Sequence, residues 1–257
     1  MFDIQLLTKP INLTLMAIIT SKIRFDKSGY YFVCLLGIAL LGFWPSYFSK
    51  FFNGTENYSF YFHFHVTMMA LWILVLIAQP ILIRKKKLTI HKFIGRITYL
   101  LMPLLFISVI LLTHLQIQNH VKIINGEKFY GPHLIIPFKD LLIFGTAYII
   151  GIIYRHDINI HARAMIATGI VFIEPALIRV VRHFIIQDIQ LSYFFTIGLV
   201  YSLLIGLMIL ERNQKRGRWV FPLILGLYII VHSIFIFQVR IGVWETFAKW
   251  FADLSLT

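Results

Sequence analysis

Long apolar stretches separated by short polar turns follow one another along most of this 257-residue chain. The stretches cover residues 31–49, 60–83, 93–113, 135–154, 164–182, 191–210 and 219–238. A helix needs about 20 mostly apolar residues to cross the hydrocarbon core of a bilayer. The pattern therefore predicts an all-α, polytopic membrane bundle of about seven transmembrane helices.

The composition favours a single integral membrane domain over residues 1–257. Hydrophobic residues make up 59% of the chain and charged residues only 14%, so little sequence remains for a soluble domain. Residues 1–24 are interrupted by charges and a proline, and residues 242–251 carry aromatic side chains at helical spacing. We expect both ends to form short interfacial segments.

The formal net charge is +13, and its distribution along the chain predicts the orientation. Two thirds of the 24 Lys and Arg residues precede the first span or lie around the second, fourth and sixth turns. The positive-inside rule then places the N-terminus in the cytoplasm and the C-terminus outside. This distribution explains the basicity without a nucleic-acid partner, and we expect none. The bilayer is the expected partner, with anionic lipids at the basic Arg84–Lys87 turn.

A motif is repeated at two of the turns predicted to be cytoplasmic. Arg84 is followed by His91, and Arg155 is followed by His161. In each copy an apolar run ends in Arg, a short polar turn follows, and Ile-His starts the next run. The repetition suggests a duplicated helical hairpin. Histidine binds metals and haem and transfers protons near neutral pH, so each turn is a candidate for chemistry.

One face of the second span carries polar and soft side chains. His65, Met69, Trp72 and Gln79 fall within about 40° of one line at 100° per residue. Such a stripe forms either a helix–helix contact with polar groups in it or the wall of a cavity or cofactor slot.

The fifth span repeats this arrangement and adds ionisable groups. His161, Met165 and Arg179 share one face, whereas Glu174 lies on the other. Ionisable groups within a span are costly and mark functional sites by default, although an ion pair or a snorkelling Arg179 is the structural alternative. Pro175 should kink this helix and free a carbonyl group.

Two candidate sites follow from these positions. The outer site gathers the ionisable side chains on the predicted outer side, namely His65, Glu174, Arg179 and His232. The inner site is the pair His91 and His161, unless each histidine only orders its own turn. Cys34 is the single cysteine, which excludes cysteine-based zinc or iron–sulfur sites within one chain.

The motifs resemble those of a family of bacterial polytopic membrane proteins with no established activity. They comprise His65-x3-Met69-x2-Trp72-x6-Gln79, His91-x3-Gly95-Arg96, His161-Ala-Arg163-Ala-Met165, Pro175-Ala176 and Arg179. The resemblance covers residues 60–183 and implies a multi-pass protein of the bacterial inner membrane. A weaker similarity is to small haem-binding or oxidase-assembly membrane proteins.

Four kinds of function remain open at this point, with a zinc hydrolase the least favoured of them, and the sequence does not decide whether the protein is an enzyme. The first is a redox or assembly protein that binds haem, quinone or a transition metal through helix-borne histidines. The second and third are a small-molecule or ion transporter and a non-catalytic assembly factor. A zinc hydrolase lacks a closely spaced ligand pair. The candidate cofactor-binding residues are His65, Met69, Trp72, Gln79, His91, His161, Met165, Glu174, Arg179 and His232.

Overall fold

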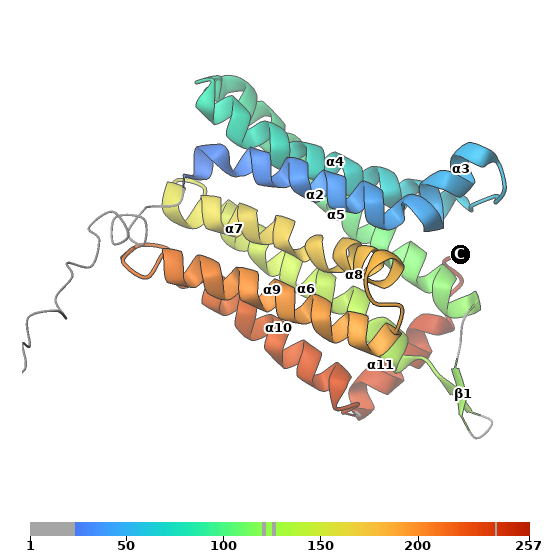
Figure 1. The fold of residues 1–257 in the computed structure, drawn as a ribbon. Helices are drawn as coiled ribbons and strands as arrows, with labels where there is room; N and C mark the ends of the chain where they lie inside the picture. Colours follow the sequence, from blue (N-terminus) through green and yellow to red (C-terminus); the bar gives the residue numbers. More distant parts are fainter. Residues whose placement is uncertain (1–23, 120–121, 125–126, 240) are drawn as a thin grey trace, which may run out of the picture.

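The structure is a computed structural model that describes residues 24–119, 122–124, 127–239 and 241–257. Long helices lie side by side in one elongated bundle (Figure 1). This confirms the predicted all-α, polytopic bundle of about seven helices. The predicted N-terminal interfacial segment lies, except for its last residue, outside the described part of the chain.

The helices follow the apolar stretches closely. The elements are a 3₁₀ turn (Phe25–Lys27), α2 (Ser28–Phe43), a π-helical segment (Trp44–Phe48), α3 (Ser49–Asn53), α4 (Phe60–Arg84), α5 (Leu88–Asn119), β1 (Lys122–Ile124), β2 (Glu127–Phe129), α6 (Gly131–Ile153), α7 (Ile158–Val171), α8 (Ile173–Phe184), α9 (Ile189–Leu210), α10 (Val220–Ile236) and α11 (Gly242–Ala252).

Length and hydropathy make six segments of the described chain long enough to cross a membrane. They cover residues 25–53, 60–84, 88–118, 134–153, 158–184 and 189–210. The seventh, α10, has 17 residues and is therefore about 25 Å long at 1.5 Å per residue. The chain is thus a multi-pass integral membrane protein whose apolar helices contact the lipid bilayer.

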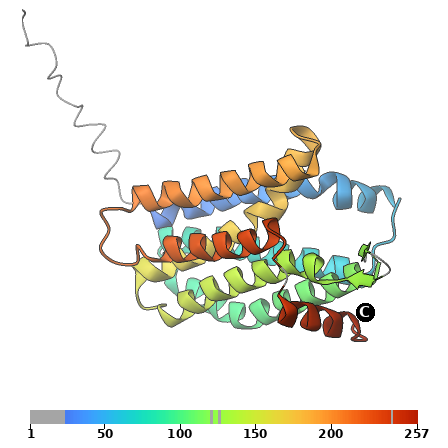
Figure 2. The ribbon, with the colours of Figure 1, turned by 90° about the horizontal axis from the view of Figure 1, so that it is seen from below.

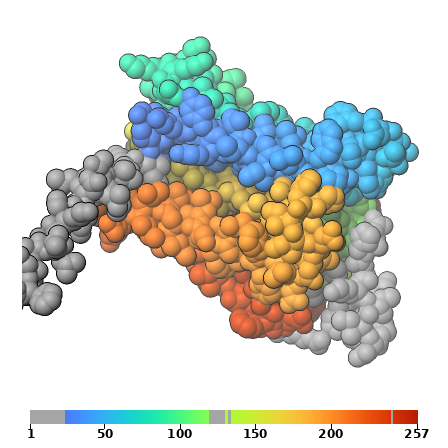
Figure 3. Space-filling model, in the orientation of Figure 1, coloured from blue at the N-terminus to red at the C-terminus, as the bar shows by residue number. Residues whose placement is uncertain are grey.

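The fifth span is the most deeply buried of these segments. Its first half, α7, packs against α4, α6, α8 and α10. Figure 3 shows α7, in yellow, set back between α2, in blue, and α9, in orange. A central helix has few lipid-facing positions, so its side chains determine how its neighbours pack.

The predicted kink in the fifth span is present as a break at Phe172, between α7 and α8. Pro175 lies three residues beyond the break. Proline has no N–H to donate, and its ring collides with the carbonyl group four residues earlier, here that of Val171. As a result α7 ends at Val171, and Glu174 falls in the first turn of a new helix.

Helix α2 approaches α8 closely at Gly42. A Cβ atom at Gly42 would overlap the carbonyl oxygen of Ala176 in α8. A Cβ atom at Gly37, on the same helix, would meet nothing within 4 Å. Small residues allow such backbone contacts between membrane helices.

The aromatic C-terminal stretch forms helix α11, which packs against the ends of α5 and α6 (Figures 1 and 2). Phe251 is buried there and makes edge-to-face ring contacts with Phe138 of α6 and His114 of α5. Gln118 Nε2 donates a 2.6 Å hydrogen bond to the carbonyl oxygen of Ala252. These contacts fix α11 at the end of the bundle that holds the C-terminus.

Candidate functional site

Three ionisable side chains from three helices meet inside the bundle, in the half predicted to face outward. Lys139 Nζ of α6 donates a 2.5 Å hydrogen bond to Glu174 Oε1 of α8 and lies 3.2 Å from His232 Nε2 of α10. His232 Nε2 also lies 3.3 Å from Glu174 Oε2. All three residues are buried. We call Lys139, Glu174 and His232 the charged network.

The position of Glu174 follows from the local sequence. The break before Pro175 makes Ile173 the first residue of α8, and the positive end of a helix dipole favours a carboxylate in the first turn. Glu174 is the acidic residue in that first turn. Local structure therefore stabilises a negative charge that tertiary contacts to Lys139 and His232 then compensate.

Asp140 extends the network toward the edge of the bundle. Its Oδ1 lies 3.2 Å from Lys139 Nζ, and its side chain retains 23% of its exposure. This contact has the distance of an ion pair but not the alignment of a hydrogen bond, because Asp140 Oδ1 finds no hydrogen-bond partner. The side chain of Asp140 is therefore more exposed at the bundle surface than those of Lys139, Glu174 and His232.

Three tyrosines surround the network. Tyr201 OH lies 3.0 Å from His232 Nδ1, and the two rings stack. The Tyr228 ring centroid lies 5.3 Å from Lys139 Nζ, a cation–π distance. The Tyr193 ring meets His232 edge-on at 6.0 Å. The hydroxyl groups of Tyr193 and Tyr228 are buried without a hydrogen-bond partner in the described residues.

The two contacts of His232 Nε2 are mutually exclusive. A neutral imidazole with its proton on Nδ1 donates to Tyr201 and accepts from Lys139 at Nε2. An imidazole protonated on Nε2 turns that atom into a donor toward Glu174. The position of one proton therefore decides which partner His232 binds.

The predicted outer cluster is only partly assembled. Glu174 and His232 meet as expected, whereas Arg179 and His65 make their hydrogen bonds outside the charged network. Arg179 Nη1 donates a 2.5 Å hydrogen bond to the carbonyl oxygen of Pro175, and its guanidinium lies 4.2 Å from the Phe43 ring centroid. His65 Nδ1 lies 3.3 Å from the hydroxyl of Ser108, at hydrogen-bond distance.

Lys139 was missed as a site residue, because its charge was counted among those of the outer side. It lies within the predicted span 135–154, and the rule that singled out Glu174 applies to it equally. The signal was therefore present in the sequence. The partners of Lys139 could not be predicted from the sequence, because Glu174 and His232 are 35 and 93 residues away.

The polar stripes of the second and fifth spans make helix–helix contacts. Trp72 is buried, and its Nε1 donates a 3.3 Å hydrogen bond to Thr168 of α7. Met69 and Met165 are partly buried against the main apolar core. Gln79 Nε2 donates a 3.2 Å hydrogen bond to the carbonyl oxygen of His91 and so links α4 to α5.

The inner histidines occupy equivalent ends of two tight hairpins, α4–α5 and α6–α7. The two side chains are close enough for an electrostatic interaction. His161 Nδ1 lies 2.8 Å from the carbonyl oxygen of Gly151, so Nδ1 carries a proton and a neutral ring leaves Nε2 as its acceptor. His91 Nδ1 is buried and has no hydrogen-bond partner in the described chain.

Arg163 forms a second buried ion pair at the predicted cytoplasmic end. Its Nη2 donates a 2.7 Å hydrogen bond to Glu211 Oε1, and its Nε donates to Glu211 Oε2. Both side chains are almost fully buried. Arg163 flanks the fourth turn in the sequence and is one of the cations that predict the orientation, whereas in the structure it forms a core contact between α7 and the end of α9.

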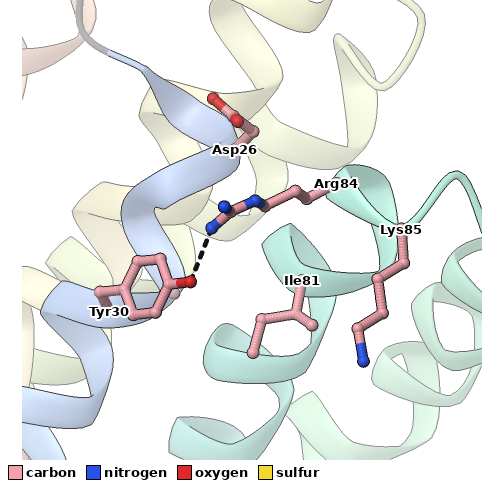
Figure 4. A pocket seen from close by; sticks show the side chains of 6 residues that line it. Asp26, Tyr30, Ile81, Arg84 and Lys85 are labelled. Atoms are coloured by element: carbon pink, nitrogen blue, oxygen red, sulfur yellow. Dashed lines mark hydrogen bonds between the residues drawn. The ribbon is translucent and has the colours of Figure 1, made fainter.

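A pocket of about 490 Å³ lies between α2 and α4 at the same end of the bundle (Figure 4). Arg84 donates a 2.6 Å hydrogen bond to Tyr30 OH, and Lys85 points away from that pair. Asp26 and Ile81 also line the pocket. Two cations and one carboxylate thus line this pocket, where a membrane surface is predicted.

No group of three or more His, Cys, Asp and Glu side chains in the described ranges is arranged to hold a metal ion. Fold and site together define the class of this protein as a polytopic integral membrane protein with a buried charged network. Comparison with family models, curated proteins and solved structures finds no match.

Proposed function

We propose that the protein is a proton-coupled transporter of a small solute. The observation that carries this proposal is the charged network at the interruption between α7 and α8. Transporters commonly place their substrate and coupling-ion sites at interrupted membrane helices, where free backbone groups and ionisable side chains meet. Lys139, Glu174 and His232 supply groups that can exchange protons there.

Coupling would act through His232. With a neutral ring, His232 accepts from Lys139 and leaves Glu174 Oε2 without a hydrogen bond. With Nε2 protonated, His232 donates to Glu174 and releases Lys139 from this contact. Since α6, α8 and α10 carry these residues, a change of proton position changes which helices are linked. This is the kind of bistable contact on which alternating access depends.

The test uses purified protein in proteoliposomes that contain a trapped pH-sensitive dye. Small amines, amino acids, carboxylates and sugars are added outside in turn, and internal pH is followed. We expect one solute class to change internal pH with the wild type. Glu174→Gln should abolish that response, because glutamine keeps the shape of the side chain but lacks the negative charge that pairs with Lys139 and His232.

Glu56→Gln is the matched control, since Glu56 lies in an exposed connection and pairs with Lys50. It should transport like the wild type, and protein-free liposomes account for passive permeation of neutral amines. A wild type that responds to none of the classes, or a Glu174→Gln variant that responds normally, would contradict the proposal.

Cofactor binding at the inner histidines is the second candidate. It is favoured by His161, whose Nδ1 donates to the carbonyl oxygen of Gly151 and so leaves Nε2 of a neutral ring as the ligand atom. Haem, quinone or a transition metal would then serve a redox or assembly role. A visible absorption spectrum and metal analysis of the purified protein decide this, because a haem band or stoichiometric metal that His161→Ala removes supports it.

Anionic lipids are the proposed partners at the Arg84–Lys87 turn, in a bacterial inner membrane. The pocket beside Arg84 and Lys85 supports this, because it offers two cations and the Tyr30 hydroxyl to a phosphate. Native mass spectrometry should detect less bound phosphatidylglycerol after Arg84→Gln and Lys85→Gln together. Unchanged lipid retention would contradict the assignment.

A further inference from the structure

We infer that the charged network is a binding site for a primary ammonium group, that Lys139 is its internal occupant, and that the solute exchanged for a proton is a small primary amine. This inference rests on the proposed transport function and specifies its substrate class. Figure 1 shows that the helices which carry the site, α6, α8, α9 and α10, lie together in one half of the bundle.

The surroundings of Lys139 Nζ match the needs of an ammonium group. An ammonium has three N–H donors and no acceptor. Nζ has hydrogen-bond contacts to Glu174 Oε1 at 2.5 Å and His232 Nε2 at 3.2 Å. Asp140 Oδ1 lies at ion-pair distance, 3.2 Å away, and adds a second negative charge without a hydrogen bond. The ring of Tyr228 covers a further side at 5.3 Å. Carboxylates and an aromatic face together select a compact cation.

The site contains buried hydrogen-bonding atoms that Lys139 does not contact. Glu174 Oε2 and the hydroxyl groups of Tyr193 and Tyr228 are buried and lack hydrogen-bond partners in the described residues. Tyr228 is fully buried and Glu174 is 3% exposed. Buried polar atoms are rarely left unpaired in folded proteins. These atoms therefore offer hydrogen bonds to a guest, in addition to those that Lys139 occupies.

Exchange keeps the charge of the site constant. When a solute ammonium enters, the Nζ–H bond of Lys139 breaks, and its electron pair stays on the nitrogen. The proton passes to the carboxylate of Asp140, the most exposed acidic group of the cluster, and leaves the site from there. One positive charge enters as one leaves, so the exchange is electroneutral. The charges that face the site are those of Lys139, Asp140, Glu174 and His232, with Arg179 close enough to interact with Asp140.

The test removes the Lys139 side chain by substitution and then adds a small ammonium ion that can take its place. Lys139→Ala removes the side chain beyond Cβ, and propylammonium has the same three carbons and nitrogen as the missing part. We expect the Tm of the detergent-solubilised Lys139→Ala protein to fall, and propylammonium chloride to restore most of the loss in a saturable manner. Sodium and tetramethylammonium chloride at equal concentration should restore little, because they cannot donate three hydrogen bonds.

Lys50→Ala is the control, because Lys50 is an exposed lysine that pairs with Glu56 outside the charged network. Its Tm should not respond to propylammonium. If Lys139→Ala cannot be purified alone, its yield after solubilisation with propylammonium becomes the measurement. Equal effects of propylammonium and tetramethylammonium, or no recovery of either Tm or yield, would overturn the inference.

The outcomes separate this inference from the transport proposal. Recovery by propylammonium in a protein that moves no solute would leave the ammonium site standing and remove transport. Transport of carboxylates or sugars, without recovery by propylammonium, would support transport and exclude the ammonium site.

Discussion

At the scale of the residue, the structural role of a charged side chain depends on the side chain that it pairs with. Arg163 has the sequence context of a loop cation, yet it is buried against Glu211. Lys139 is likewise buried against Glu174. Removing a charge from water is costly, so each persists only because an acceptor from another helix compensates it. The sequence marks such residues as ionisable but does not give their partners.

We predict that Glu211→Gln destabilises the protein by about 3–5 kcal/mol, because it leaves the buried guanidinium of Arg163 without its counter-charge. The double variant Arg163→Met with Glu211→Met should recover most of this loss, since neither side chain then carries an unpaired charge. Thermal unfolding in detergent measures both.

Glu56→Gln serves as the control for this prediction. Lys50 donates a 2.5 Å hydrogen bond to Glu56 and so lowers the pKa of that carboxyl, but both side chains are exposed. Exposed pairs contribute little to stability, so the Tm should hardly change. Equal Tm losses for Glu211→Gln and Glu56→Gln would show that burial of the Arg163 pair does not matter.

At the scale of the element, the sequence predicts where helices break better than where they touch. Pro175 predicted the interruption of the fifth span, because its effect on the backbone is local. The contact between Gly42 of α2 and Ala176 of α8 was not predicted. Glycines recur in membrane helices, and only the packed structure distinguishes Gly42 from Gly37.

We predict that Gly42→Ala lowers the Tm, whereas Gly37→Ala leaves it unchanged or raises it. At Gly42 the new methyl group meets a backbone oxygen of α8, which can move away only if the helices separate. At Gly37 it meets open space, and alanine favours a helix over glycine by about 0.5–1 kcal/mol. The two variants differ only in position, so similar Tm values would refute the close contact.

At the scale of the whole molecule, the repeated hairpins are alike in outline and different in detail. In α4–α5, Gln79 hydrogen-bonds the backbone of His91, whereas in α6–α7 the His161 ring itself bonds to Gly151. The sequence repeat therefore predicts the shape of the two hairpins. It does not predict that their histidines play the same role.

We predict that the turns at Lys86 and Asn213 face the cytoplasm and that the connection at Glu56 faces outward. The asymmetric distribution of Lys and Arg is the reason. Single cysteines at these positions, in a Cys34→Ser background, are labelled with a membrane-impermeant maleimide in right-side-out vesicles. Only the cysteine at position 56 should react before the membrane is broken, and early labelling at position 86 would reverse the topology.

The class of this protein, its helices and the break before Pro175 can be predicted from the sequence alone, because hydropathy and proline geometry act over one helix at a time. The sequence also singled out Glu174, His232 and the inner histidines, since ionisable groups stand out in an apolar span. The contacts of Lys139 with Glu174 and His232, and the hydrogen bonds of Arg179 and His65 outside the charged network, follow from the packing of the helices. Those contacts join residues up to 93 positions apart, and their geometry depends on how whole helices pack.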